Sequence, residues 1–161
     1  MKKLPYKEGD WFAVPLGNDR YGVGLIARAA PKGRVLLGYF FDRFFRGVPS
    51  LSDIADLTPD KAVDVLRFGD LSLFKGEWPI LGPLPDWDRS RWPMPLYIGR
   101  DLLVPRAWRV EYSDQDPNRV VRRERVPHDT TGIGSDSLYG AGAVEITLRK
   151  LMEKTEPIIA S

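Results

Sequence analysis

The chain has 161 residues, no cysteine, one histidine (His128) and a formal net charge of +2 from 24 Lys and Arg against 22 Asp and Glu. The absence of cysteine excludes disulfides, thiolate metal sites and cysteine nucleophiles, and one histidine excludes a multi-histidine metal site. The near balance of charge gives no sign of a polyanionic partner. With 43% hydrophobic residues, we expect one globular domain over residues 1–161 and no cofactor.

The N-terminal segment begins with Met1, Lys2 and Lys3, but no apolar run of the kind that a signal peptide needs follows them. No segment approaches the roughly 20 apolar residues that a membrane span requires. We therefore expect a cytoplasmic protein without a membrane partner.

The first third of the chain predicts three strands. Residues 11–16 are apolar on both alternating faces, as in a strand that is covered on both sides, and Pro15 indicates an edge or a bulge. Residues 21–29 predict a second strand, in which Tyr21, Val23, Leu25, Ala27 and Ala29 share one face and glycines thin the other. Residues 35–41 predict a third. Short turns join the three, so we expect an antiparallel meander, forming a bent sheet or a small, partly open barrel.

The middle of the chain is less regular. Residues 51–57 predict a short helical turn that ends before Pro59. The segment that follows fits a helix capped by residues 58–60 or a strand that includes Val63, Val65, Leu66 and Phe68. We favour the strand.

A long Pro/Trp-rich loop is predicted over residues 76–95, which contain five prolines together with Trp78, Trp87 and Trp92. The simpler interpretation is a loop that its aromatic rings hold against the core. The alternative is a partner-binding surface, because Trp and Arg dominate the energetic centres of protein interfaces. On this second interpretation the candidate contact residues are Asp86, Trp87, Asp88, Arg91 and Trp92.

Residues 108–126 predict a hairpin. Trp108, Val110 and Tyr112 alternate with polar residues in the first strand, which indicates one buried face. The returning strand has no apolar face, and its four arginines suggest a charge-protected edge; they are Arg119, Arg122, Arg123 and Arg125. We include these arginines in the candidate interface. Clustered cations also suit nucleic acid, but nearby carboxylates dilute the field, so nucleic acid is the less favoured partner.

The C-terminal region predicts the clearest helix, because apolar residues recur at helical spacing from Leu138 to Met152. Asp136 or Ser137 is expected to cap its start, and Pro157 prevents its continuation. The preceding glycine-rich segment, residues 132–142, lacks the Gly-Lys-[Ser/Thr] sequence of a phosphate-binding loop and is interpreted as a flexible lead into the helix. The fold class is therefore mainly β (α+β), with one C-terminal helix.

No catalytic constellation is evident. His128 and Asp129 are adjacent in an extended segment, so their side chains point to opposite sides and form no dyad. The local carboxylate pairs, Asp53 with Asp56 and Asp86 with Asp88, have no accompanying motif and are more typical of turn caps. We expect a protein that is not an enzyme.

Four segments in order resemble the immunity protein 26 family of bacterial polymorphic toxin systems: 7–16 (KEGDWFAVPL), 20–24 (RYGVG), 37–40 (LGYF) and 76–82 (GEWPILG). The resemblance covers roughly residues 6–115. It implies a mainly β, cytoplasmic protein that binds and neutralises a cognate toxin domain. It assigns a role to no individual residue.

Two other classes stay open on the residues alone. One is a nucleic-acid or small-ligand binding β-barrel module, which the arginine-rich strand would serve. The other is an enzyme that uses carboxylates in a cleft beneath the Pro/Trp-rich loop. Toxin binding is favoured because neutralising a toxin needs only a stable scaffold with a complementary surface.

Overall fold

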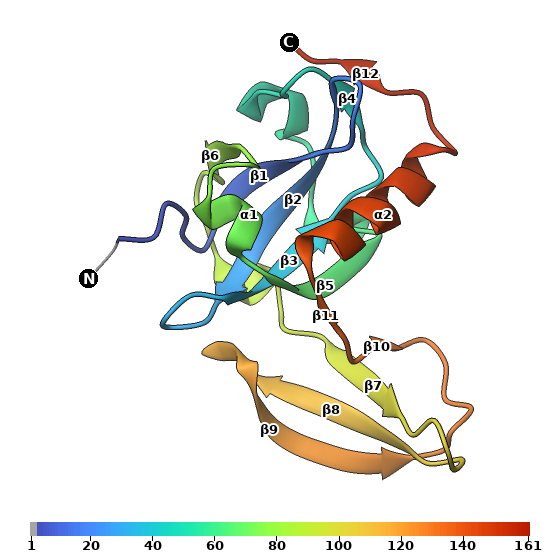
Figure 1. The fold of residues 1–161 in the computed structure, drawn as a ribbon. Helices are drawn as coiled ribbons and strands as arrows, with labels where there is room; N and C mark the ends of the chain where they lie inside the picture. The colour runs from blue at the N-terminus through green and yellow to red at the C-terminus, as the bar shows by residue number, and fades with distance from the viewer. Residues whose placement is uncertain (1–2) are drawn as a thin grey trace.

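The protein is described by a computed structural model that covers residues 3–161. Met1 and Lys2, the start of the segment in which we expect no signal peptide, lie outside the described residues. The fold is mainly β and consists of two open sheets with one C-terminal helix (Figure 1). The prediction of a mainly β fold is confirmed, and of the two predicted forms the open, bent sheet is the one observed.

The meander predicted from the first third forms the centre of the first sheet. Its strands are β1 (Asp10–Pro15), β2 (Arg20–Ala29) and β3 (Val35–Phe40), and they pair antiparallel in this order. The preferred strand in the middle region is also present, as β5 (Asp64–Gly69), which pairs with β3. One detail of the prediction is wrong: a register shift between Ile26 and Arg28 turns Ala29 to the opposite face.

Short helices connect the strands of this sheet, and two short strands extend it. The predicted helical turn is a 3-10 helix, η1 (Leu51–Ile54), and a second one, η2 (Pro59–Lys61), precedes β5. The Pro/Trp-rich segment is not wholly loop, because β6 (Ile80–Pro83) pairs with β1 and η3 (Arg89–Arg91) follows it. A four-residue helix, α1 (Leu71–Phe74), connects β5 to this segment, and β4 (Phe45–Arg46) pairs with the start of β2.

The second sheet has four strands, three of which form an antiparallel meander. Its strands are β7 (Leu96–Arg100), β8 (Ala107–Ser113) and β9 (Asp116–Val126). The order β10-β7-β8-β9 places β9 at the edge, as its arginine content predicts. In Figure 1 this sheet lies below the first, and the β7–β8 turn is at its far end.

The chain then crosses back to the first sheet. β10 (Gly134–Ser135) runs parallel to β7, and β11 (Leu138–Tyr139) runs parallel to β5. The helix α2 therefore starts later than predicted, at Ala141, and ends at Met152, with Gly140 as its N-cap. The predicted cap Asp136 is used elsewhere, since its backbone and side chain join the two sheets. The last strand, β12 (Ile158–Ile159), pairs with β4.

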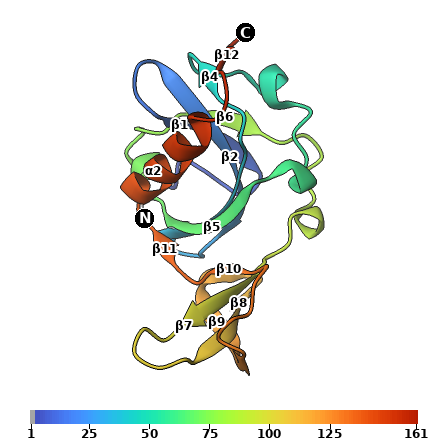
Figure 2. The ribbon, with the colours of Figure 1, turned by 90° about the vertical axis from the view of Figure 1, so that its right-hand side faces the viewer.

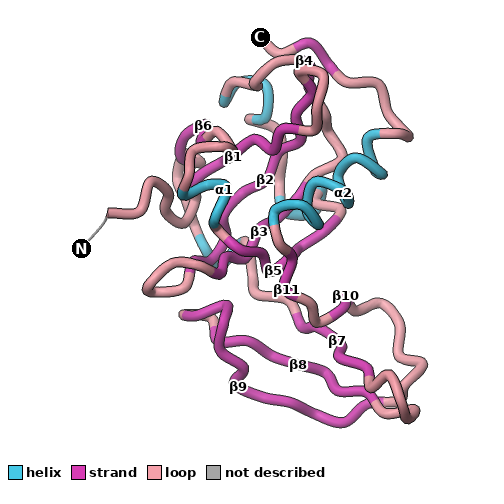
Figure 3. Tube along the Cα trace, in the orientation of Figure 1, coloured by secondary structure: helices cyan, strands magenta, loops and turns pink. Residues whose placement is uncertain are grey.

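Both faces of the first sheet are buried, as the uninterrupted apolar run of β1 predicts. One face carries a cluster that includes Phe12, Phe40, Phe68 and Trp78 and is covered by α2. The other face carries a cluster around Trp11, over which the second sheet and the Pro/Trp-rich segment pack. Figures 2 and 3 show this layered order, with α2 on one side of the first sheet and the second sheet beneath it.

Two strand glycines allow the aromatic packing on the α2 side. A Cβ at Gly24 would lie 2.6 Å from Phe12, and one at Gly38 would lie 2.7 Å from Phe68. Both distances are shorter than any carbon–carbon contact tolerates, so the rings occupy the space that a side chain would need.

Buried tyrosines predict a loss of stability at high pH. Burial raises the pKa of Tyr39 and Tyr112 to about 12, and it also raises the pKa of Tyr6 and Tyr97. The folded state then keeps phenol protons that the unfolded chain releases near pH 10. We expect the free energy of unfolding to fall between about pH 10 and pH 12. Denaturant titrations across this pH range measure the free energy of unfolding, and phenolate absorbance reports the ionisation of the tyrosines. A free energy of unfolding that stayed constant would contradict the prediction.

Candidate functional site

The Pro/Trp-rich segment is held in place by a network of ion pairs between charged side chains. Arg28, only 2% exposed, donates to the carboxylate of Asp114 and to the carbonyl of Arg89. Arg89 in turn pairs with Asp114 at 2.7 Å and with Glu8 at 2.8 Å. Burial acts to raise the pKa of Asp114, but the two guanidinium groups outweigh it and hold that pKa below its ordinary value. The network fastens η3 to the N-terminal segment and to the β8–β9 turn.

The two tryptophans of the predicted interface have different positions. Trp92 is 3% exposed and packs edge-on against Trp11 and Tyr39 in the core, so the prediction that it contacts a partner is revised to a supporting role. Trp87 is half-buried and lies against Gly9, where a Cβ would come within 2.9 Å of the indole. The simpler interpretation, a segment held by its rings, describes this part of the chain.

A shallow groove runs beside this segment. Two adjoining cavities of about 240 and 380 Å³ share Ala55, Leu84 and Pro85 as lining residues. Trp11 lines one of them, and Asp86, Asp88 and Arg91 line the other. The groove therefore has an apolar base and a charged rim formed by candidate residues.

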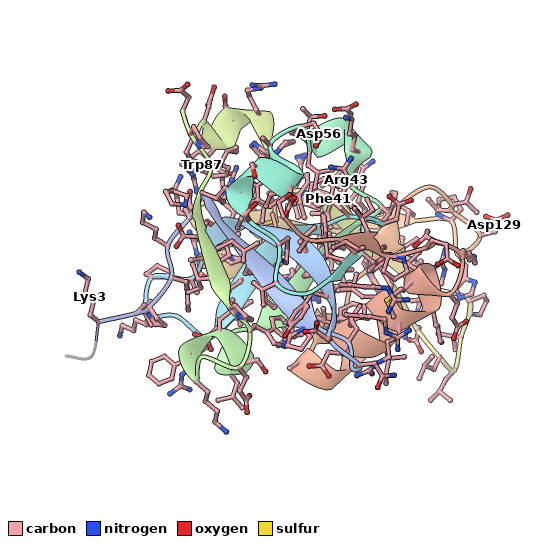
Figure 4. All side chains as sticks on the ribbon, turned by 90° about the horizontal axis from the view of Figure 1, so that it is seen from above. Lys3, Phe41, Arg43, Asp56, Trp87 and Asp129 are labelled. Carbon is pink, nitrogen blue, oxygen red and sulfur yellow. The ribbon has the colours of Figure 1, made fainter. Side chains whose placement is uncertain are left out.

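Local contacts restrain much of that rim. Asp88 accepts hydrogen bonds from the hydroxyl and the backbone N–H of Ser90, and these hold its pKa below the ordinary value. Next to Ala55 of the groove, Asp56 accepts hydrogen bonds from both guanidinium nitrogens of Arg43, which hold the pKa of Asp56 below its ordinary value. Asp56, Arg43 and Trp87 lie along one side of the molecule (Figure 4). Asp86 is exposed in a left-handed conformation at φ 56°.

The four arginines of β9 are all exposed, but they face in different directions. Arg122 lies opposite Glu111 on one face of the hairpin, next to the ion pair of Arg109 with Glu124. Arg123 and Arg125 lie on the other face, opposite Val110 and Trp108. Arg119 donates to the hydroxyl of Ser113 near the β8–β9 turn. The candidate residues thus occupy two surfaces, the groove and the β9 edge, rather than one.

The β7–β8 turn carries exposed residues that the sequence analysis did not single out. Leu102 is 97% exposed and Leu103 is 93% exposed, and Val104 and Pro105 beside them are also exposed. A cavity of about 450 Å³ lies between this turn and His128. The available signal was an apolar run, Leu-Leu-Val-Pro, just before the alternating strand at Trp108, in a position where turn residues are usually polar.

The described part of the chain shows no metal-binding constellation. Within residues 3–161, no group of three or more His, Asp or Glu side chains could hold a metal ion. His128 is exposed, and its backbone carbonyl accepts a hydrogen bond from Arg100. None of the helices in residues 3–161 is long and apolar enough to cross a membrane.

A comparison with protein families finds one match. The model of a family described as immunity protein 26 matches residues 7–109, which include β1 to β7 and the start of β8. No curated protein and no solved structure matches significantly.

Proposed function

The chain belongs to the immunity protein 26 family, and on this premise we propose that it binds and neutralises a cognate bacterial toxin in the cytoplasm, by protein–protein contact and without catalysis. The family match over residues 7–109 is the observation that carries the proposal, because it includes most of the first sheet. The proposal needs a rigid scaffold with an accessible, complementary surface.

The ionic contacts of the chain support such a scaffold. Arg28 and Arg67 are buried, and each donates hydrogen bonds to a carbonyl and a carboxylate in distant parts of the chain. The surface, in contrast, combines apolar side chains with charges of both signs, as protein interfaces do. Rigid partners lose little conformational entropy on association, so a surface on this scaffold can bind tightly.

The geometry favours a protein partner over nucleic acid. A phosphate backbone requires cations that are free to face it. On one face of the β8–β9 hairpin, however, Arg109 and Arg122 are paired with Glu124 and Glu111, so that face carries balanced charge. Arg123 and Arg125 on the other face are available, but two cations make a small footprint for a phosphate backbone, which needs several. A mixed pattern of this kind suits the mixed side chains of a protein surface.

The proposal is tested with the toxin domain encoded beside this protein. We expect the two purified proteins to form a complex and the toxin to lose its activity, both in the test tube and in cells that co-express them. The proposal would be contradicted if no complex formed and the toxin kept its activity. Retention on RNA or DNA that falls steeply with salt, without toxin binding, would instead favour the nucleic-acid module.

A further inference from the structure

The turn between β7 and β8 presents a large apolar surface to solvent. Leu102 and Leu103 are almost completely exposed, and Val104 is 40% exposed. Burying a leucine side chain stabilises a protein by roughly 1.5–3 kcal/mol, so two adjacent leucines left in water forgo a large gain. Neither side chain belongs to a core cluster. Apolar exposure of this kind marks interaction surfaces.

Hydrogen bonds within the turn restrain its backbone, although its side chains are exposed. The carboxylate of Asp101 accepts a hydrogen bond from the backbone N–H of Leu103 at 3.0 Å and pairs with Arg106 at 2.8 Å. The backbone N–H of Asp101 donates to the carbonyl of Arg106, which closes the turn. The backbone that carries the two leucines is therefore restrained, so binding has to order only their side chains.

Arginines lie beside the apolar turn along one face of the hairpin. The guanidinium groups of Arg106 and Arg125 lie 5.6 and 6.0 Å from the ring centre of Trp108. Arg123 follows on the same face, opposite Val110. Within residues 3–161, neither Arg123 nor Arg125 forms an ion pair with a carboxylate. This face thus carries uncompensated cations beside half-buried Trp108, whereas the opposite face is balanced.

We propose that the toxin binds here, through a surface that we call the hairpin patch, made of Leu102, Leu103, Trp108, Arg123 and Arg125. This inference rests on the proposed function. The chemistry of the patch requires a toxin surface with an apolar pocket for the leucines and carboxylates around it for the arginines. A dimer formed through this patch would bring two positively charged surfaces together, and this repulsion disfavours self-association.

The groove is the weaker candidate for the same partner. Trp92 is buried in the core, Asp88 is bound to Ser90, and Arg89 is bound to Glu8 and Asp114. A partner at the groove would have to displace these contacts or use only the few side chains that are free. The hairpin patch requires no such rearrangement.

The test measures the affinity of full-length variants for the adjacent toxin domain. The double variant Leu102→Ser/Leu103→Ser removes the apolar anchor, and we expect its dissociation constant to rise at least about tenfold. The charge reversal Arg123→Glu/Arg125→Glu should lower the association rate and weaken its dependence on salt. Thermal unfolding should be close to that of the wild type in both cases, because these side chains contact water.

Matched controls separate the possible outcomes. Ile146→Ser removes an exposed apolar side chain of α2, and Arg91→Glu reverses a charge at the groove; we expect both to bind as the wild type does. If the patch variants bind the toxin as tightly as the wild type does, this inference is overturned but the proposed function is not. If only Arg91→Glu loses binding, the site lies at the groove. Absence of wild-type binding would overturn the proposed function as well. If the free wild-type protein dimerises and the leucine variant does not, the patch binds a second copy instead.

Discussion

Replacing Trp78 by alanine is expected to lower the free energy of unfolding by about 3–5 kcal/mol, the usual cost of removing a large buried aromatic side chain. Trp78 is 1% exposed and stacks on Phe12, with ring centres 5.9 Å apart and an interplanar angle of 2°. It also stacks on Phe68, and its indole N–H donates to Glu145 of α2. One side chain therefore joins the Pro/Trp-rich segment, the first sheet and the C-terminal helix. Chemical denaturation of the variant measures the effect.

Two further variants divide this loss into its parts. Trp78→Phe keeps an aromatic ring but removes the indole N–H, and Glu145→Gln keeps an acceptor while removing the charge. Because a hydrogen bond to a charged group contributes about 1.5–3 kcal/mol and Glu145 is partly exposed, Glu145→Gln should cost less than half of what Trp78→Ala does. A loss below about 1 kcal/mol in Trp78→Ala would mean that the ring does not join these layers.

Replacing Arg67 by methionine is expected to lower the free energy of unfolding by about 3 kcal/mol, because it removes one partner from a buried polar cluster. Arg67 of β5 is 6% exposed and donates to the carbonyl of Pro117 in β9 at 2.8 Å. Its guanidinium lies 3.8 Å from the ring centre of Tyr112 and pairs with Asp136. Methionine fills most of the volume but leaves the Pro117 carbonyl and Asp136 without their cation. Equilibrium unfolding of the variant tests this value.

This cluster joins the second sheet to the first, so its loss should have a local signature. Tyr112 donates a hydrogen bond to Asp136 at 2.5 Å, and Tyr97 donates to the carbonyl of Val65. We expect amide hydrogen exchange in β8 and β9 to accelerate in Arg67→Met more than exchange in β1 and β2. Arg122→Met, which removes an exposed ion pair with Glu111, is the control and should cost at most about 0.5 kcal/mol. Equal losses in the two variants would contradict a special role for Arg67.

The candidate site could be predicted only in part. Arg122, Arg123 and Arg125 were identified as an exposed edge strand because the strand has no apolar face, and this position is confirmed. The burial of Trp92 could not be predicted, since a tryptophan among prolines suits a core anchor and an interface equally well. The exposed leucines were missed because apolar residues are ordinarily assigned to the core, and only the turn at Asp101 holds them outside it.

Local rules account for the strands and their order along the chain. Alternation, turn residues and glycine positions predicted β1, β2, β3 and the β8–β9 hairpin, because each is determined by neighbouring residues. The start of α2 was wrong for a nonlocal reason: Asp136 is a good helix cap, but it binds Tyr112 and Arg67 from distant strands instead. Long-range contacts outweighed the local preference.

The sequence by itself determined the composition limits, the mainly β class, the central meander and the family to which the chain belongs. The tertiary structure alone decided that the strands form two open sheets, which buried arginines hold together. It also decided which charged side chains form contacts inside the fold and which face water. The physical reason is that burial depends on partners far apart in the chain. Arginine is usually exposed, and Arg28 and Arg67 are buried because the fold brings Asp114 and Asp136 next to them.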